Sequence, residues 1–233
     1  MFAWVVVSGL AVGVRSASGD RSNRVVWMQW MSRRFLRLLG CRVRVHGQIP
    51  RAGLVVANHL GYVDILVLGS VCPCVFVAKS DVERWPVFGL LARMAGTVFV
   101  RRKVPMDSRK QVETLADVLR EGHPLVLFPE GTSSGGSEVL PFRSSLLEAA
   151  TARGGMTVPT ALHYHVPAPA LVERDIAFWA DMKLPQHLWN MMAIGSFEAV
   201  VAFGTPRVPE SNRKVECDSL HREVKALLAS VRD

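Results

Sequence analysis

A short apolar run at residues 53–57 leads directly into residues 58–64, which read Asn-His-Leu-Gly-Tyr-Val-Asp. An apolar run of this length, followed by turn-forming residues, is typical of a buried β-strand, and Gly61 predicts a break before the next element. On a regular helix, the spacing of five residues would rotate His59 and Asp64 about 140° apart. The two side chains can therefore meet only if His59 lies on a turn and Asp64 lies in the first turns of a following helix.

Along the rest of the chain, apolar runs alternate with helical patterns, which predicts an α/β fold. Residues 41–46 alternate with period two, as a half-buried strand does. The length of 233 residues suits one domain with a substantial core. We therefore expect a single-domain mixed sheet flanked by helices. Helices are expected at residues 23–39, 108–121 and 213–231, and further strands at 75–79, 97–101, 124–128, 157–161, 175–180 and 197–202.

Charge and hydropathy narrow the class of partner. Lys and Arg exceed Asp and Glu by eight, the sequence pI is about 9.9, and the mean hydropathy is +0.21. A basic, apolar-rich chain of this kind suits an anionic lipid surface or nucleic acid. The sequence has no zinc-finger spacing and no aromatic–basic signature of an RNA-binding sheet, so nucleic acid is not an expected partner.

The four cysteines do not form a disulfide framework for a chain of this length. Cys72 and Cys74 are too close together for the usual zinc spacing, and no second ligand pair follows them. We expect buried, reduced thiols, as in a cytosolic compartment.

The amino-terminal region is apolar at first and basic afterwards. Residues 1–14 carry no charge, but they are shorter than the stretch of about 20 residues that spans a bilayer. Small residues at 16–18 resemble the cleavage site of a secretory signal, although no positive charge precedes the apolar stretch. The arginines that follow favour a cytoplasmic flank.

A helix at residues 23–39 combines Trp27, Trp30 and Met31 with several arginines. This pattern favours a helix that lies in the membrane interface; the alternative is an ordinary amphipathic helix docked on the core. We expect residues 1–39 to form a membrane-associated segment, and the protein to bind the cytoplasmic face of the cell membrane as a monotopic or peripheral protein.

A second polar segment, Phe-Pro-Glu-Gly-Thr-Ser-Ser at residues 128–134, follows the predicted strand at 124–128. Open α/β sheets bind ligands at the carboxyl ends of their strands, where a carboxylate, a glycine and a hydroxyl suit a hydroxyl-bearing ligand. The run at 96–102 ends in Arg101 and Arg102, whose planar guanidinium groups match phosphate or carboxylate oxygens. A fourth run, at 158–162, carries a proline, as sheet ends and edges do.

These four blocks, in this order and at these separations, resemble the glycerolipid acyltransferase family, whose type members are the bacterial 1-acylglycerol-3-phosphate acyltransferases. The resemblance covers roughly residues 24–205, and it rests mainly on the His-x4-Asp and Phe-Pro-Glu-Gly-Thr blocks together. It implies that residues 40–233 form the catalytic domain of an acyltransferase. Such an enzyme moves a fatty acyl group from acyl-CoA or acyl-carrier protein to the hydroxyl of a lysolipid. The expected acceptor is 1-acylglycerol-3-phosphate, which gives phosphatidate, and lyso-ornithine lipid is an alternative.

The resemblance also implies roles for single residues. His59 would be the general base and Asp64 its orienting partner, in a direct transfer that needs no acyl-enzyme, no metal and no cofactor beyond the thioester. Backbone amides near the His59 turn are expected to stabilise the oxyanion. The acceptor-binding residues would be Arg102, Glu130, Gly131 and Thr132, with Arg101 and Arg143 as further candidates.

The sequence departs from the family pattern after Phe142. Family members often have Lys or Arg and then Gly where this chain has Ser144 and Ser145. This departure bears on the headgroup of the acceptor and not on the acyl chemistry.

Three other patterns offer competing interpretations. Residues 131–135 match Gly-x-Ser-x-Gly, the nucleophile elbow of serine hydrolases, with Ser133 as the nucleophile, but that elbow requires a helix straight after the serine. His163 and His165 could share a strand face as metal ligands, or they could be strand-end histidines satisfied by neighbours. Residues 184–192 are either an apolar surface element that touches acyl chains or plain core.

Overall fold

The computed structural model describes residues 21–85, 87–100, 109–147 and 155–232. Among these residues, seven strands form one sheet in the order β1-β7-β6-β2-β5-β3-β4. The strands are β1 (Cys41–His46), β2 (Leu54–Ala57), β3 (Val75–Lys79), β4 (Val98–Val100), β5 (Leu125–Leu127), β6 (Thr157–His165) and β7 (Phe197–Phe203). All neighbouring pairs are parallel except β6 and β7. The predicted single-domain mixed sheet is confirmed.

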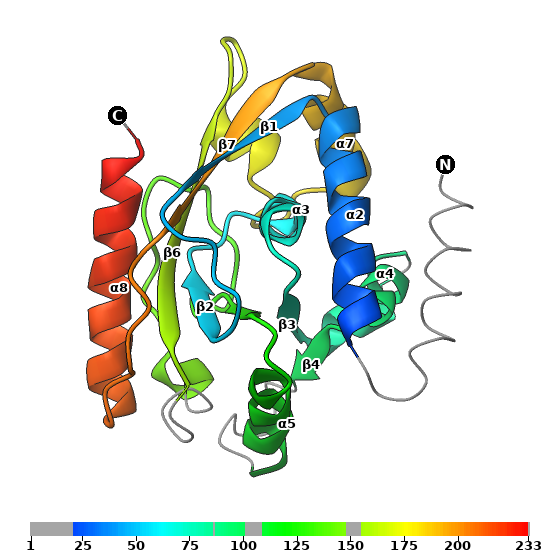
Figure 1. Cartoon of the computed structure of the whole chain (residues 1–233). Coiled ribbons are helices and arrows are strands. Elements are labelled where there is room, and N and C mark those ends of the chain that lie inside the picture. Colours follow the sequence, from blue (N-terminus) through cyan, green and yellow to red (C-terminus); the bar gives the residue numbers. More distant parts are fainter. Residues whose placement is uncertain (1–20, 86, 101–108, 148–154, 233) are drawn as a thin grey trace.

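Helices cover both faces of this sheet (Figure 1). On one side lie α2 (Ser22–Leu38), α3 (Tyr62–Val71) and α4 (Phe88–Met94), and α8 (Arg213–Ser230) covers the other. Leu115 of α5 (Arg109–Arg120) shares a core cluster with Leu220 of α8. The remaining elements are α7 (Leu184–Ala193) and the short helical turns η1 (Ser80–Arg84), η2 (Ser144–Leu147) and η3 (Val172–Ile176).

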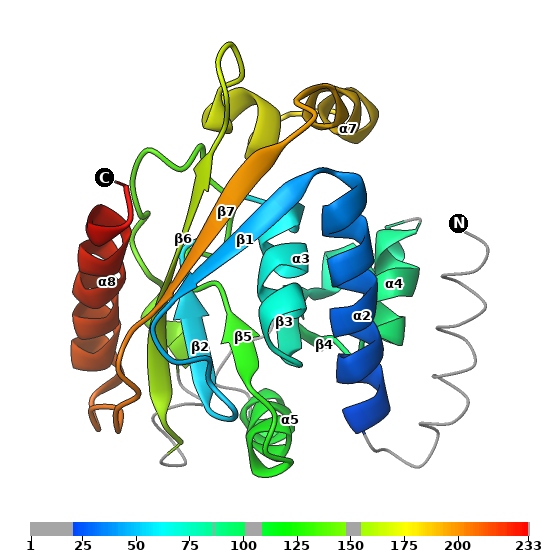
Figure 2. The ribbon, with the colours of Figure 1, turned by 45° about the horizontal axis from the view of Figure 1, so that its top comes forward.

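The strand β2 lies in the middle of the sheet, between β6 and β5 (Figure 2). All four of its residues are buried, as expected for a parallel strand that is covered on both faces. Leu54 pairs with Leu125 and Val56 with Leu127, so the two strands end side by side. The loops that follow β2 and β5 therefore leave the sheet at the same edge.

Helix α2 is docked on the core, along α3. Trp27 and Met31 are buried, at 5% and 3% exposure. At Gly69 of α3 a Cβ atom would lie only 2.9 Å from Ser32 Oγ, so the two helices approach closely there. The expectation that Trp27 and Met31 face a membrane is wrong, because their apolar surface is already covered by the protein.

Two side chains of α2 also cap the carboxyl end of α3. Arg33 Nε donates to the carbonyl oxygen of Ser70 at 2.9 Å, and Gln29 Nε2 donates to that of Val71 at 3.2 Å. The last carbonyl groups of a helix have no partner within it, so α2 stabilises α3 from its carboxyl end. Residues 1–20, which make up about half of the predicted membrane segment, lie outside the described residues. None of the helices in the described part of the chain is long and apolar enough to cross a bilayer.

The strand predicted at residues 175–180 is wrong. Residues 172–176 form a single helical turn, η3, and no strand follows it there. The Asp175 carboxylate accepts a hydrogen bond from the Leu171 amide at 2.9 Å and pairs with Arg174 at 2.7 Å. These bonds close the backbone into a turn, and Ile176 fills the core without entering the sheet.

Candidate active site

The turn between β2 and α3 carries His59 and is held to the sheet by Asn58. The Asn58 side chain is 3% exposed. Its Nδ2 donates to the Leu162 carbonyl at 3.0 Å, and its Oδ1 accepts from the Leu162 amide at 2.8 Å. The side chain thus continues the hydrogen bonding of β2 with β6 past the end of the strand, and it fixes where the turn begins.

The predicted strand–turn–helix geometry is confirmed. Helix α3 begins at Tyr62, and Asp64 lies in its first turn. His59 Nδ1 lies 2.8 Å from Asp64 Oδ2. Because a carboxylate only accepts, Nδ1 carries the proton, so in the neutral form of the ring Nε2 is the nitrogen with the lone pair. The His59 side chain is 20% exposed, whereas the Asp64 side chain behind it is fully buried.

Asp64 is fully buried and accepts four hydrogen bonds. Oδ2 accepts from His59 Nδ1 and from the amides of Leu60, at 2.6 Å, and Gly61, at 2.9 Å. Oδ1 accepts from the Tyr164 hydroxyl at 2.6 Å. Burial and the adjacent Asp64 carboxylate raise the pKa of Tyr164 well above its usual range, so the hydroxyl remains a donor. A carboxylate taken out of water needs such partners to remain charged.

Gly61 allows a second segment to pass close to this turn. A Cβ atom on Gly61 would lie 2.9 Å from the backbone nitrogen of Phe178. That nitrogen donates to the Leu60 carbonyl at 2.8 Å. Any larger residue at position 61 would therefore push the segment that precedes α7 away from the turn.

The segment at residues 128–134 holds His59 from three directions. The Phe128 ring stacks on the imidazole, with ring centroids 4.1 Å apart. The His59 amide donates to Glu130 Oε1 at 2.9 Å, and the His59 carbonyl accepts from the Ser134 amide at 3.0 Å. The two sequence blocks that carry the family resemblance are thus brought together, because β2 and β5 are parallel neighbours.

Glu130 is 2% exposed, and both of its carboxyl oxygens have partners. Oε1 accepts from the His59 amide and Oε2 from the Leu140 amide, at 3.2 Å. Burial raises the pKa of Glu130 to about 8, although the two amide hydrogen bonds act in the opposite direction.

The other residues predicted to bind the acceptor lie near this segment or outside the described residues. Thr132 is exposed, and Gly131, with φ of 71°, is partly exposed. The exposed Arg143 is fixed beside the segment, since its amide donates to the Pro129 carbonyl at 2.9 Å. Arg101 and Arg102 lie outside the described residues, so their predicted role stays a prediction.

The expectation that amides of the His59 turn stabilise an oxyanion is wrong for three of them. The amide of His59 donates to Glu130, and those of Leu60 and Gly61 donate to Asp64. Donors already engaged with buried carboxyl groups are not available to a reacting oxygen.

The competing sites are not assembled in the described part of the chain. Ser133 Oγ donates to the Phe178 carbonyl at 2.6 Å, and no helix follows it, so it lacks both the base and the elbow of a hydrolase. His163 and His165 face each other with ring centroids 4.6 Å apart, and burial lowers the pKa of His163 to about 4. The described residues contain no group of three or more side chains suited to a metal ion. All four cysteines are free and buried, as predicted.

Three supporting residues were not predicted from the sequence. Asn58 and Phe128 lie within the recognised blocks. Asn58 directly follows one strand-like run and Phe128 ends another, and these positions could have indicated that both lie near the site. Tyr164 lies 100 residues from Asp64. Its place in a Thr157–His165 strand did not indicate which side chain it would meet.

The Tyr164 bond to Asp64 should contribute measurably to stability. Tyr164→Phe should lower the free energy of unfolding by about 1.5–3 kcal/mol, as for a hydrogen bond to a charged group, measured by urea denaturation. The control is Tyr62→Phe, because the Tyr62 hydroxyl lies 2.9 Å from His187 Nδ1. Burial lowers the pKa of His187, which keeps it neutral. For Tyr62→Phe the free energy of unfolding should therefore fall by only about 0.5–1.5 kcal/mol. A smaller loss for Tyr164→Phe than for Tyr62→Phe would contradict this ranking.

Glu130 should make stability depend on pH. Its pKa is raised from 4.5 to about 8 in the folded chain, so the folded state binds the proton more tightly than the unfolded state does. The stabilising effect is fully present below pH 4.5 and is lost as the pH rises to about 8. Relative to Glu130→Gln, the wild-type protein should lose thermal stability between pH 5 and pH 8. Parallel curves of melting temperature against pH for the two proteins would refute the raised pKa.

Comparisons with known proteins agree with this geometry. The acyltransferase family model matches residues 42–163, which include His59, Asp64 and Glu130. A lyso-ornithine lipid O-acyltransferase of Rhizobium meliloti is 42% identical over 193 residues, which are 76% of this chain; the chain spans slightly less than two thirds, 66%, of that relative's length. A 1-acyl-sn-glycerol-3-phosphate acyltransferase of Neisseria gonorrhoeae is 29% identical over 79% of this chain and 72% of its own.

The fold also has a solved counterpart. The crystal structure of the 1-acyl-sn-glycerophosphate acyltransferase PlsC from Thermotoga maritima superposes with a TM-score of 0.72 and 23% sequence identity, over 99% of this chain and 91% of that one. At this identity the likeness concerns the fold alone. Together with the family match over more than half of the sequence, these findings show that the chain belongs to the acyltransferase family.

Proposed function

We propose that this protein transfers a fatty acyl group from an acyl thioester to the free hydroxyl of a lysolipid. The observation that carries the proposal is the pairing of His59 Nδ1 with the buried Asp64 carboxylate, in a side chain that is 20% exposed. In the neutral ring this pairing makes Nε2 the nitrogen that can accept a proton. A neutral imidazole with a carboxylate behind it is suited to remove a proton from a hydroxyl group.

In this reaction His59 Nε2 takes the hydroxyl proton as the acceptor oxygen attacks the thioester carbonyl carbon. The C–S bond of the resulting tetrahedral intermediate then breaks, and the imidazolium returns the proton to the leaving thiolate. Asp64 stabilises the imidazolium through the Nδ1 bond. The donor, acyl-CoA or acyl-carrier protein, is a co-substrate, and the steps as written require no metal or redox cofactor.

The acceptor has two candidates, lyso-ornithine lipid and 1-acylglycerol-3-phosphate. Relatives named lyso-ornithine lipid O-acyltransferases are 35–42% identical to this chain, whereas the Neisseria relatives named for 1-acyl-sn-glycerol-3-phosphate are 29% identical. Ser144 and Ser145, which replace the basic residue and glycine common in the family, remove one cation that a phosphate headgroup would use. We therefore propose lyso-ornithine lipid as the first acceptor to test.

The acceptor would lie against the exposed part of the 131–143 segment. Gly131 and Thr132 present backbone and hydroxyl groups there, and Arg143 supplies a cation. Arg101 and Arg102 are proposed to complete this site. A panel assay of the purified protein in mixed micelles, with both lysolipids and both donors, tests this function directly. The absence of acyl transfer in all four combinations would overturn it.

Removing the base should abolish transfer. His59→Ala should lower kcat by at least the roughly 10²–10⁴-fold that general-base catalysis supplies, with folding retained. Asp64→Asn should also lose most activity. Its amide oxygen can accept the three N–H groups at Oδ2, and its NH₂ can donate to Tyr164, so the variant removes the charge and keeps the geometry. Both effects are measured as initial rates under saturating donor.

Ser133→Ala provides the matched control for the hydrolase interpretation. Ser133 Oγ donates only to a backbone carbonyl, so this variant should keep most of its turnover. Near-normal transfer by His59→Ala, or its loss in Ser133→Ala at unchanged stability, would contradict the proposed mechanism.

We further propose that the protein works at the cytoplasmic face of an anionic membrane, as a monotopic or peripheral protein. The net charge of +8 supports attraction to such a surface. Helix α7 carries no Asp, Glu, Lys or Arg, and it exposes Trp189 and Met192 at 72% and 63%. Exposed Trp beside apolar residues on an otherwise uncharged helix is typical of an interfacial contact.

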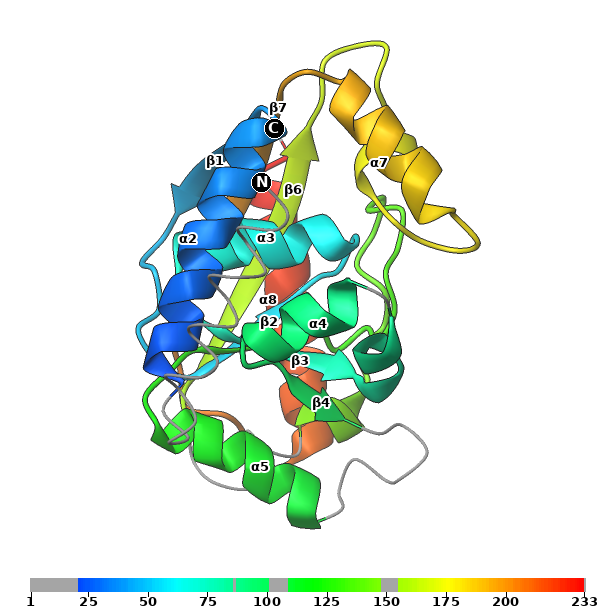
Figure 3. The same ribbon diagram turned by 90° about the vertical axis from the view of Figure 1, so that its right-hand side faces the viewer.

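The position of α7 connects that surface with the site. Tyr62, at the start of α3, packs on His187 of α7 and on Phe88 of α4, with ring centroids 5.5 and 5.8 Å apart. Figure 3 shows α7 and α4 on either side of the β2–α3 turn. A membrane that contacts α7 would therefore lie beside the turn that carries His59.

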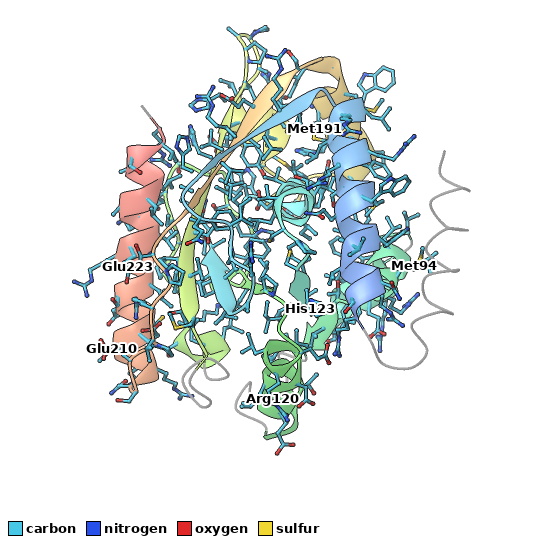
Figure 4. All side chains as sticks on the ribbon, in the orientation of Figure 1. Met94, Arg120, His123, Met191, Glu210 and Glu223 are labelled. Carbon is cyan, nitrogen blue, oxygen red and sulfur yellow. The ribbon has the colours of Figure 1, made fainter. Side chains whose placement is uncertain are left out.

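Replacing Trp189 and Met192 by serine should weaken binding to phosphatidylglycerol-containing vesicles by at least tenfold, since a tenfold loss requires only about 55 Å² less buried apolar surface at roughly 25 cal/mol per Å². Co-sedimentation measures this. The control is Val208→Ser with Val215→Ser, two residues that are also exposed, at 69% and 51%. Val215 belongs to α8. Glu210, which lies between the two valines in the sequence, is at the α8 side of the molecule, away from Met191 of α7 (Figure 4). Equal loss in the two double variants would contradict a contact through α7.

A further inference from the structure

The Glu130 carboxyl group is enclosed by the protein. The residue is 2% exposed. One oxygen accepts the His59 amide at 2.9 Å and the other accepts the Leu140 amide at 3.2 Å. Its neighbours in sequence differ in this respect, because Gly131 is partly exposed and Thr132 is exposed.

We propose that Glu130 is a positioning residue that fixes the His59 backbone, and that it makes no contact with the acceptor headgroup. This inference rests on the proposed acyl transfer only for its kinetic consequences. It departs from the role that the position of Glu130 within the Phe-Pro-Glu-Gly-Thr block implies.

A contact with the headgroup would disrupt the site that Glu130 builds. Glu130 is 2% exposed, so a headgroup could reach its carboxyl group only if the His59 turn or the segment at Leu140 moved away. That movement would leave the His59 or Leu140 amide without its partner, which costs more than an ordinary hydrogen bond returns. Enclosure by the protein, and not a lack of lone pairs, therefore keeps Glu130 from the acceptor.

The bond to the His59 amide completes a set of restraints on one residue. Phe128 stacks on the ring, the Ser134 amide holds the carbonyl, and Asp64 holds Nδ1. Glu130 holds the one remaining backbone group, the amide. Fixing both backbone groups as well as the ring determines the direction in which Nε2 points. A general base must have this direction fixed before the substrate binds.

The electrostatics of Glu130 agree with this role. Burial raises its pKa to about 8, and the nearby Asp64 charge acts in the same direction. The carboxyl group is then mostly protonated at pH 7, so it presents no full charge to a cationic headgroup. It functions through the geometry of its two hydrogen bonds.

The first test does not need a substrate. In protein with ¹⁵N-labelled histidine, the His59 Nδ1–H signal is identified by its loss in His59→Ala. Glu130→Gln should shift or broaden this signal, because its NH₂ group cannot accept one of the two amides. Glu138→Gln is the matched control, since Glu138 is an exposed residue of the same loop. An unchanged His59 signal in Glu130→Gln would overturn the proposal.

The second test separates positioning from binding. With whichever lysolipid the wild type acylates, Glu130→Gln should lower kcat by about 10- to 100-fold, because small misplacements of reacting groups cost up to about 100-fold. The KM for the lysolipid should change less than about twofold, since the substitution removes no contact with the bound lysolipid. Glu130→Ala should lower kcat more than Glu130→Gln does, because glutamine retains one acceptor oxygen. Glu138→Gln should have the kcat of the wild type. Thermal unfolding of each variant verifies that it is folded.

The outcomes are distinguishable. A raised KM for the lysolipid with kcat unchanged would show that Glu130 contacts the acceptor, and it would overturn the proposal. If the wild type acylates neither lysolipid, the proposed function fails. The His59 signal in Glu130→Gln and Glu138→Gln still decides the role of Glu130 in that case.

Discussion

The buried carboxylate of Asp64 is the constraint on which the site depends. A fully buried carboxylate is costly unless every lone pair that it exposes to the interior is satisfied. Two amides of the turn, the His59 ring and the Tyr164 hydroxyl meet this requirement. The same four bonds determine the shape of the turn, the start of α3 and the tautomer of His59. Satisfying the charge of Asp64 and orienting the His59 ring are therefore achieved by the same hydrogen bonds.

Parallel pairing in the centre of the sheet explains why two sequence blocks about 70 residues apart form one site. Strands β2 and β5 run side by side in register, so the segments that follow them emerge together. The two segments contribute different groups to the site. The turn after β2 provides the imidazole, and the segment after β5 provides the ring, the carboxyl group and the amide that hold it. This is the edge at which open α/β sheets generally bind ligands.

The sequence predicts this site well wherever the relevant contacts are local. The need for a break between His59 and Asp64 follows from helix geometry, and the structure has that break at Gly61. Prediction from the sequence fails where a pattern indicates that a side chain is buried but not which surface or residue it contacts. The apolar face of α2 indicates burial, but periodicity does not distinguish a protein core from a membrane, and Trp27 is buried in the core. Tyr164 was missed for the same reason, since its contact joins residues 100 positions apart.

The distribution of burial within the 128–143 segment separates the residues that hold the His59 backbone from those that solvent reaches. Glu130 and Ser134, which contact the backbone of His59, are buried, whereas Thr132 and Arg143 are exposed. A substitution at the buried positions alters the placement of His59. Under the proposed function, the exposed positions and the neighbouring Ser144 and Ser145 are those where a substitution changes the headgroup that is accepted, while the geometry of His59 and Asp64 is kept. Relatives named for two different lysolipids are consistent with one fold built in this way.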